Sequence, residues 1–226
     1  ADCGCRTPRL KSWSQAWRGP LREALDWLAA ELDKVYAARA ERHAEPALLE
    51  MRRQRLAMFT SCGWFFDDIS GIETAQILKH AARAVSIAET LGVELTSEFK
   101  RRLSDCPSNV SSFKDGAGVY AKLVLPCRVD AHRLAAHWAI LEHLRPGLGS
   151  SPPDWRLEAG NPARASKQGR AGRDRFLSAR QVSATRLSTL ESRVFTAVVH
   201  QRDRLDVACR LGPAEFDASG LLKAFE

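Results

Sequence analysis

The stretch Pro20-Leu-Arg-Glu-Ala-Leu-Asp-Trp-Leu-Ala-Ala-Glu-Leu-Asp-Lys-Val35 decides the fold class of this chain. Its apolar side chains recur at alternating steps of four and three residues, at Leu21, Leu25, Leu28, Leu32 and Val35. A helix of 3.6 residues per turn places all of these positions on one face. Proline is also well suited to the first position of a helix. The pattern therefore predicts an amphipathic helix that begins at Pro20 and ends at about Arg42.

Similar patterns predict further helices along the first two thirds of the chain. Ser70-Gly-Ile-Glu73 has the form of a capping box, in which Ser70 accepts from the Glu73 amide. Small residues on one stripe of the helix that follows would let a neighbouring helix approach closely. The expected helices after the first run from Glu45-Pro46 to about Ile69, from Ile72 to Leu91 with Gly92 as C-cap, from Ser97 to Leu103, from Val119 to Leu125, and from an Asp130 N-cap to just before Arg145-Pro146.

The composition and the hydrophobic pattern of the sequence change after Arg145. Residues 146–174 are rich in Pro, Gly, Ser and Arg and have no apolar period, which is typical of a linker and a flexible basic loop. Residues 175–226 contain β-branched and alternating runs, and Arg193–His200 is the best strand candidate. We therefore expect a mainly α protein: an antiparallel helical bundle over residues 1–145, then the linker, then a small antiparallel β segment over residues 175–226.

Composition excludes several classes of protein. With 226 residues and 45% hydrophobic side chains, the chain can bury a sizeable core. No apolar stretch approaches the roughly 20 residues of a membrane span, and no signal peptide is visible. The six cysteines are spread too widely for a stapled secreted domain, which predicts reduced thiols and a cytoplasmic protein. The chain begins at Ala1 rather than Met, which suggests a processed or excised product.

Metal and cofactor chemistry are not expected. Cys3-Gly-Cys5 could supply half of a tetrahedral site, but no second cluster accompanies it. The histidines do not fall at the spacing of a zinc hydrolase motif, and no nucleophile elbow or phosphate-binding glycine loop is present. We therefore assign no catalytic residue, no metal ligand and no cofactor.

The net charge is +7, and most of the excess of basic residues lies late in the chain. Between Arg145 and His200 there are ten Lys and Arg against four Asp and Glu. Such a stretch could neutralise phosphates. However, the most basic part, Arg164–Arg175, holds no aromatic side chain for base stacking. A solvated loop is the better interpretation, and we do not expect a nucleic-acid partner.

The run Thr60-Ser-Cys-Gly-Trp-Phe-Phe-Asp-Asp-Ile-Ser-Gly-Ile-Glu-Thr74 carries the functional signal. Each helical step turns by about 100°, so three consecutive aromatic residues cannot share one buried face. An indole can stack on the apolar face of a sugar, while carboxylates accept hydrogen bonds from its hydroxyls. We therefore predict that Trp64, Asp67 and Asp68 bind substrate. The alternative is an aromatic core cluster in which the two aspartates cap the next helix.

Two carboxylates also raise the question of glycosidase chemistry. The two catalytic groups of a retaining enzyme flank one bond at a separation of about 5 Å. Adjacent residues on a helix diverge, so Asp67 and Asp68 are poorly placed for this task. We predict that the chain alone has no catalytic apparatus.

Several motifs together resemble one family. They are Asp2-Cys-Gly-Cys5, Trp17–Trp27, Thr60–Thr74, Ala81-Ala-Arg-Ala84, Pro107-Ser-Asn109 and Val129–His137. In these motifs the chain resembles the domain of unknown function 3536, which follows a glycoside hydrolase family 57-type barrel in bacterial proteins. The resemblance covers roughly Ala1 to Leu144 strongly and the rest loosely.

The resemblance implies a context in carbohydrate metabolism. Family 57 enzymes act on α-glucans, and their catalytic Glu and Asp belong to the barrel, which this chain lacks. Ser61-Cys-Gly-Trp64 is similar to a motif that closes over the cleft in related branching enzymes. The implied partners are a family 57-type barrel, in cis or as a separate chain, and an α-glucan or oligosaccharide.

Two interpretations of the aromatic run stay open. In one, Trp64 is the principal sugar-contacting side chain and Asp67 or Asp68 accepts from the hydroxyls. In the other, Trp64 packs in the interior and Phe65 is the exposed ring. A purely structural scaffold or interaction module is the alternative to a glucan-binding module.

Overall fold

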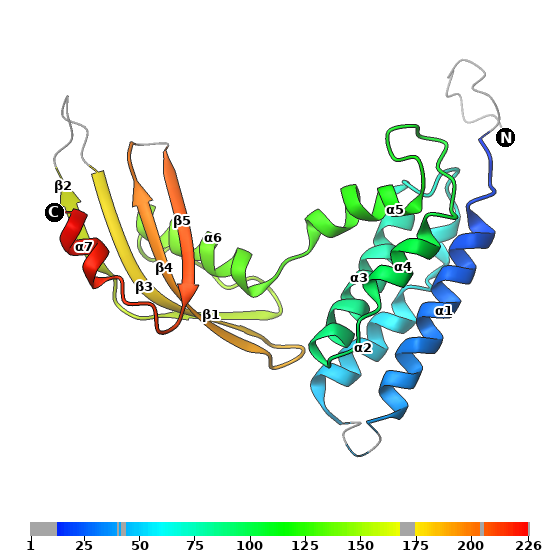
Figure 1. Cartoon of the computed structure of the whole chain (residues 1–226), viewed down its shortest axis with the longest axis horizontal. Coiled ribbons are helices and arrows are strands. Elements are labelled where there is room, and N and C mark those ends of the chain that lie inside the picture. Colours follow the sequence, from blue (N-terminus) through cyan, green and yellow to red (C-terminus); the bar gives the residue numbers. More distant parts are fainter. Residues whose placement is uncertain (1–12, 40, 42–43, 168–174, 204–205, 226) are drawn as a thin grey trace. The chain divides into compact units, whose positions relative to one another are not determined.

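The computed structural model describes residues 13–39, 41, 44–167, 175–203 and 206–225. The chain divides into two compact units, Ala1–Arg128 and Val129–Glu226. Figure 1 shows helices in the first unit and a sheet with helices in the second. Each unit has its own hydrophobic cluster.

The helical unit is built from amphipathic segments. Its elements are α1 (Arg18–Ala37), α2 (Pro46–Ala57), the 3-10 turn η2 (Ser61–Trp64), α3 (Ile72–Thr90), α4 (Thr96–Leu103), α5 (Gly116–Val119), the π-helical turn η3 (Tyr120–Val124) and the 3-10 turn η4 (Leu125–Cys127). The apolar stripe of α1 is buried along its whole length, as the sequence predicts.

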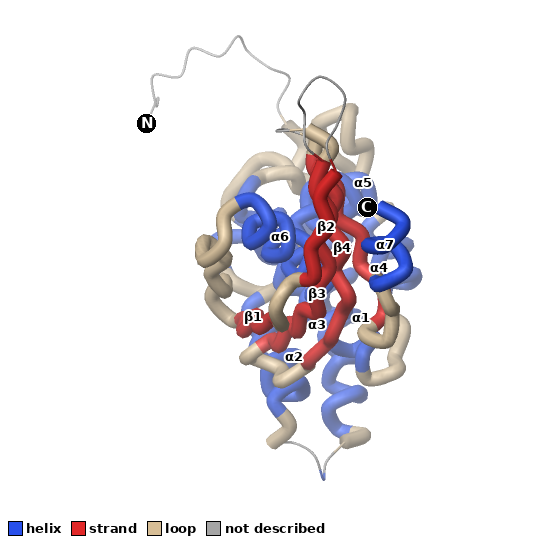
Figure 2. Tube along the Cα trace, turned by 90° about the vertical axis from the view of Figure 1, so that its left-hand side faces the viewer, coloured by secondary structure: helices blue, strands red, loops and turns tan. Residues whose placement is uncertain are grey.

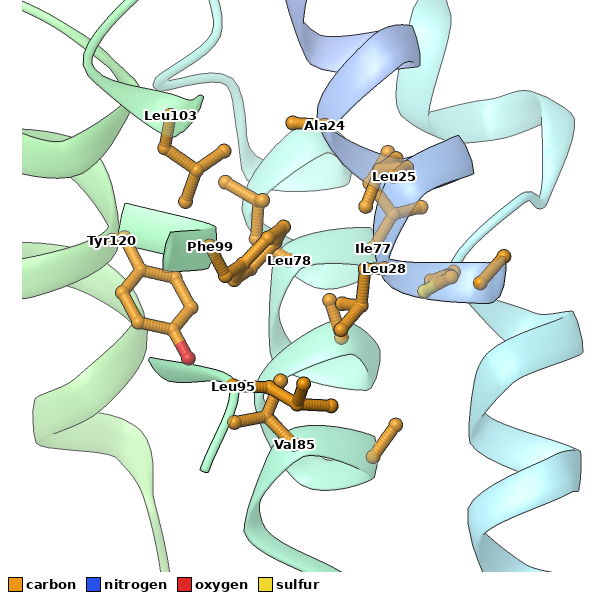
Figure 3. Close-up of a cluster of buried hydrophobic side chains, with 14 of the residues drawn as sticks. Ala24, Leu25, Leu28, Ile77, Leu78, Val85, Leu95, Phe99, Leu103 and Tyr120 are labelled. Atoms are coloured by element: carbon orange, nitrogen blue, oxygen red, sulfur yellow. The ribbon is translucent and has the colours of Figure 1, made fainter. Parts of the chain in front are cut away.

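The centre of this unit lies where α1, α3, α4 and η3 meet (Figure 3). Phe99 and Tyr120 pack edge to face there, with ring centroids 5.6 Å apart. Burial raises the pKa of Tyr120 to about 12. On α3, Ala81, Ala84 and Ala88 are fully buried. Because alanine side chains are short, the helix axes can approach closely at these positions.

The second unit is an antiparallel sheet with a helix on either face. Its elements are α6 (Ala131–Leu144), β1 (Trp155–Ala159), β2 (Ala163–Lys167), β3 (Arg175–Arg186), β4 (Ser192–Gln201), β5 (Val207–Pro213) and α7 (Ser219–Phe225). The strand order is β1-β3-β4-β5, and β2 pairs with the other half of the long strand β3. Figure 2 shows α6 and α7 on opposite sides of the strands.

Alternation along β4 explains which face each helix covers. Phe195, Ala197 and Val199 are buried in the cluster that includes α6, and His132 of α6 contacts the Phe195 ring at 4.4 Å between centroids. His200, the residue after Val199, contacts Phe225 of α7. Successive strand residues point to opposite faces, so α6 and α7 cover opposite faces of the sheet. The Asp130 carboxylate caps α6, as expected, by accepting from the Arg133 amide at 2.9 Å.

The expectation of a mainly α fold with a helical bundle is wrong. Within the described residues, a five-stranded antiparallel sheet makes the chain mixed α and β. Two strands, β1 and β2, lie inside residues 146–174, the expected linker and flexible loop, of which residues 168–174 are outside the described part. These strands are short and mostly exposed, so they lack an apolar period and are held by backbone pairing to β3. The helix α6 falls with the sheet and not with residues 1–128.

The region between α2 and α3 also differs from expectation. The second helix ends at Ala57 rather than near Ile69, and a 3-10 turn and an irregular loop follow. Gly71 is the N-cap of α3 and no side chain caps it. The Ser70 hydroxyl donates instead to Asp68, so the expected capping box with Glu73 does not form.

The close approach of backbone atoms to Gly118 in the helical unit gives a test of the packing. A Cβ atom on Gly118 would lie 1.9 Å from the Phe113 carbonyl oxygen, which is backbone and cannot rotate away. We expect Gly118→Ala to lower the free energy of unfolding by about 1–3 kcal/mol. Urea unfolding followed by far-ultraviolet circular dichroism measures this loss.

Gly19→Ala is the matched control, since nothing lies within 4 Å of the added atom. It should leave stability unchanged or raise it by less than ~1 kcal/mol. Equal destabilisation by both substitutions would contradict the assigned packing.

Candidate functional site

The residues Trp64–Asp68, called here the aromatic loop, connect η2 to the turn before α3. The structure exposes the middle of this loop and buries its end. Phe65 is 73% exposed and Phe66 46% exposed, and Asp67 is also exposed. Trp64 is half-buried, and Asp68 is 3% exposed. Only Trp64 belongs to the 3-10 turn η2, and the residues after it are irregular, so the three aromatic side chains have different environments.

Asp68 anchors the aromatic loop through five hydrogen bonds. Its Oδ1 atom accepts from the Ser70 amide at 2.9 Å, the Ser70 hydroxyl at 2.6 Å and the Ser108 hydroxyl at 2.9 Å. Its Oδ2 atom accepts from the Asn109 amide at 2.5 Å and the Asn109 side-chain amide at 3.1 Å. The carboxylate thus ties the loop to the turn at residues 107–109, about forty residues later in the chain.

These donors decide the charge state of Asp68. Burial alone would favour the neutral carboxylic acid, but the hydrogen bonds from Ser70, Asn109 and Ser108 outweigh burial and lower the pKa below its usual value. Donors directed at both oxygens stabilise the ionised form. Asp68 is therefore a fixed anion with no proton to give at neutral pH.

The backbone of the aromatic loop is held from the other side by α1. The Trp17 indole Nε1 donates to the Asp67 carbonyl at 3.2 Å, and the Arg18 guanidinium donates to the Phe66 carbonyl at 3.2 Å. The Asn109 side-chain amide also donates to the Asp67 carbonyl, at 3.2 Å. Two consecutive carbonyls are thus bound by side chains, so the loop keeps one shape without belonging to a helix or strand.

Trp64 packs against the fully buried Trp17. The two rings are nearly parallel, with an interplanar angle of 7° and centroids 6.2 Å apart. Gly63 precedes Trp64 in the chain, and a Cβ atom at Gly63 would come within 2.6 Å of the Ile77 side chain. The Thr74 hydroxyl binds the Gly63 carbonyl at 2.7 Å. Trp64 therefore closes the end of the core and offers only part of its surface to solvent.

Asp67 is the polar group of the loop that solvent reaches. Its Oδ1 atom accepts from the Gln15 side-chain amide at 3.1 Å. Within the described residues no donor binds its Oδ2 atom, which is free to accept from a ligand. The exposed Phe65 and Phe66 rings precede this carboxylate directly in the chain. The loop thus presents apolar ring surface and a hydrogen-bond acceptor together.

The three residues expected to bind substrate have different surroundings. Trp64 is half-buried against Trp17, Asp67 is exposed, and Asp68 is enclosed by its five donors. The arrangement with Trp64 packed and Phe65 exposed is the one that the structure contains. Asp67 and Asp68 do not flank a common cleft as a catalytic pair would.

Sequence reasoning missed the residues that hold the loop in place. They are Gln15, Trp17, Arg18, Ser108 and Asn109. A signal was present, because Trp17 begins one quoted motif and Pro107-Ser-Asn109 is another. Their spacing along the chain gives no indication that these motifs meet around Asp68.

A second polar cluster joins α2 to α3 but is fully satisfied. The His80 Nδ1 atom lies 2.7 Å from the Gln54 amide oxygen, the Gln54 amide nitrogen donates to Glu50 at 2.7 Å, and Arg53 pairs with Glu50. Burial and then the Arg53 charge lower the pKa of His80. Each buried polar atom named here has a partner, so this cluster joins two helices and offers no open ligand position.

Metal and thiol chemistry find little support in the part of the chain that is described. No group of His, Cys, Asp and Glu there could hold a metal ion. Cys62, Cys106, Cys127 and Cys209 are all unpaired, and burial raises the pKa of Cys106 to about 12. The Cys3-Gly-Cys5 motif lies outside the described residues. None of the described helices has the length and apolar character that a bilayer crossing requires.

Comparison with known proteins places this site in a family. The chain matches the family model described as Domain of unknown function (DUF3536) over residues 13–46 and 38–219. These ranges include the aromatic loop, α1, the turn at residues 107–109 and the whole described sheet. No curated protein and no solved structure matches the chain.

The role of Asp68 gives a second prediction. Asp68→Asn places an amide group opposite donors that need an acceptor, and we expect it to lower the free energy of unfolding by about 2–4 kcal/mol. Asp67→Asn, at an exposed neighbour, should change it by less than about 0.5 kcal/mol. Urea unfolding of the two variants side by side makes the comparison.

The same contacts predict a pH dependence. The folded-state pKa of Asp68 lies below the unfolded value near 3.8, so its stabilisation is present above that pH and is lost as pH falls through the folded pKa. The stability difference between the wild type and Asp68→Asn should therefore shrink in acid. A difference that stays constant from pH 7 to pH 2 would exclude the ionised anchor.

Proposed function

The chain belongs to the DUF3536 family, and on this premise we propose that it is a non-catalytic module of a glycoside hydrolase family 57-like carbohydrate-active enzyme. In this proposal the helical unit helps to form an α-glucan binding cleft beside a catalytic barrel. The barrel is supplied in cis or by a separate chain, and it provides both catalytic carboxylates. The family 57 context rests on the resemblance of the sequence motifs.

One observation carries the proposal: a rigidly held loop exposes aromatic surface to solvent. Exposing a phenyl ring to water is unfavourable, and globular chains usually bury such rings. Here Phe65 is 73% exposed while hydrogen bonds from Trp17 and Arg18 fix the backbone beneath it. The backbone of the loop therefore does not have to be ordered when a ligand binds, which lowers the entropic cost of binding.

The chemistry of the loop suits a sugar. Phe65 offers a flat apolar face for the ring of a glucose unit. The free Oδ2 atom of Asp67 can accept from a hydroxyl at the rim of that ring. Asp68 is a positioning residue in this arrangement, because its oxygens are already occupied by protein donors. Trp64 supports the loop by packing against Trp17.

The same carboxylates explain why the module is proposed as non-catalytic. A general acid must carry a proton at working pH, and the donors around Asp68 keep it ionised. Asp67 follows the aromatic residues directly and has no second free carboxylate within the described loop to share a glycosidic bond with. The chain alone is expected to leave starch and maltooligosaccharides uncut.

A scaffold role is the second candidate, and Ile72 favours it. This aliphatic side chain at the first position of α3 is 77% exposed, close in sequence to the exposed phenyl rings. Sugars gain little from an aliphatic contact of this kind, whereas a protein partner would bury it. In this version the aromatic loop and Ile72 dock on the barrel without touching glucan.

Two substitutions separate the two candidates. Phe65→Ala should weaken binding of maltoheptaose to the chain about fivefold, since ring stacking is worth on the order of 1 kcal/mol. Ile72→Ala is the matched control, and it should leave the oligosaccharide affinity within about twofold of the wild type. Calorimetric titration measures both variants, and urea unfolding checks that both remain folded.

The opposite pattern would favour the scaffold. If the chain gives no heat with maltoheptaose at millimolar concentration, or if Ile72→Ala weakens binding as much as Phe65→Ala does, the aromatic loop is not a glucan site. The chain should also produce no new reducing ends from soluble starch. Turnover that disappears in Asp67→Asn would contradict the non-catalytic assignment.

A further inference from the structure

A cluster of basic and polar side chains lies in the sheet unit, where the last turn of α6 meets β2, β3 and β4. Its members are Arg164, Arg180, Ser178, His143 and Gln201. Arg164 lies opposite Ser178 in the β2–β3 register, and directly paired residues share a face of a sheet. The cluster is therefore on the face that α6 covers, and it is separate from the aromatic loop of the other unit.

Arg180 is the member that calls for a ligand. Its side chain is 8% exposed, its guanidinium carbon lies 5.5 Å from the centroid of the Trp138 ring, and its Nη1 atom is 3.8 Å from Glu142. No described residue accepts a hydrogen bond from it. A guanidinium carries five N–H donors in a planar fork, and the Arg180 nitrogens are not among the buried atoms that lack a partner, so solvent reaches them. The structure thus holds a mostly buried cation whose donors face solvent and whose one described ionic partner is the long pair with Glu142.

Glu142 makes only a long ion pair with Arg180, and its Oε2 atom, which faces Arg180 at 3.8 Å, accepts from the Gly147 amide at 3.2 Å. Its Oε1 atom accepts from the Gly147 amide at 3.0 Å and the Gly149 amide at 2.8 Å. These two amides lower the pKa of Glu142, with Gly149 first. The nearest carboxylate to Arg180 therefore serves the turn after α6 and compensates Arg180 only through space.

Arg164 adds to the positive potential of Arg180, while His143 beside them is kept neutral. Burial lowers the pKa of His143, and the charges of Arg164 and Arg180 lower it further. Burial also lowers the pKa of Arg180, and the Arg164 charge acts in the same direction. Arg164 is exposed while Arg180 is buried, so the two guanidiniums lie at the mouth and the floor of the cluster.

The polar members fix the imidazole and do not form a nucleophile. Gln201 Oε1, 3.1 Å from His143 Nε2, can only accept, so the neutral ring carries its proton on Nε2. His143 Nδ1 then accepts from the Ser178 hydroxyl at 2.8 Å. This Ser–His pair has the spacing of an activated serine, but Ser178 is 3% exposed, so protein encloses its hydroxyl. It orients the imidazole at the edge of the cluster.

We propose that Arg180 and Arg164 bind the phosphoryl group of a small anion, with His143 and Ser178 beside it. Guanidinium forks bind phosphate oxygens bidentately, and such a group would replace the solvent that now reaches the donors of Arg180. Free phosphate and a phosphomonoester present the same oxygens, and the titration below distinguishes the two. Binding would place a dianion between two cations and remove their mutual repulsion.

The test uses the full chain and two phosphoryl probes, inorganic phosphate and glycerol phosphate. Each is titrated while the side-chain Nε–H signals of the arginines are followed by NMR, and an Arg180 shift that saturates is the expected result. Arg180→Gln should raise the dissociation constant at least about tenfold and Arg164→Gln about three- to fivefold, in line with the strength of charge-assisted hydrogen bonds. Arg164 is exposed, so its variant tests the site even if Arg180→Gln unfolds the sheet.

Arg210→Gln is the matched control. Arg210 pairs with Val198 and is exposed, and it lies on the opposite face of the same sheet. This variant removes the same charge and should change the dissociation constant by less than about twofold. Tighter binding of glycerol phosphate than of phosphate supports a phosphorylated small molecule, and equal binding supports free phosphate. An unmoved Arg180 signal at 10 mM of either probe, on the order of the weakest useful affinity, or an equal loss in Arg210→Gln, overturns the proposal.

Discussion

The buried carboxylate of Asp68 is the constraint on which the candidate site depends. It accepts five hydrogen bonds from Ser70, Ser108 and Asn109, and so it joins the aromatic loop to a turn far along the chain. A charge is stable in such a place only when donors surround both oxygens. Because the donors are backbone amides and short side chains, the loop has one backbone conformation. That conformation places Phe65 at the surface.

The two units place their buried charges differently. In the helical unit, the buried charge of Asp68 is fully hydrogen-bonded, and the exposed surface of the aromatic loop is apolar. In the sheet unit, the mostly buried charge of Arg180 makes one long ion pair with Glu142, and solvent reaches its donors. The first arrangement suits a ligand with an apolar face and hydroxyls, and the second suits an oxyanion. We therefore propose two recognition surfaces of different chemistry, one in each unit.

Periodicity in the sequence predicts the elements that bury one regular face, and it fails elsewhere. The stripe of α1, the Asp130 cap of α6 and the strand around Arg193–His200 are confirmed. The strands β1 and β2 could not be predicted because they are short, exposed and held by backbone pairing. The capping box at Ser70 was a false signal, since a nearby carboxylate accepts from its hydroxyl. The aromatic loop was recognisable as unusual, but which ring is exposed depends on the long-range contact between Trp64 and Trp17.

An acid titration followed by NMR tests the role of Asp68 most directly. The carboxyl carbon of Asp68 is observed together with the amide signals of Ser70 and Asn109 and the indole signal of Trp17. All four should move together, with a midpoint below the ordinary value of 3.8, because protonation breaks the contacts that hold the loop. A carboxyl that titrates at or above 3.8, or amides that stay unmoved while it titrates, would show that the aromatic loop does not depend on this anion.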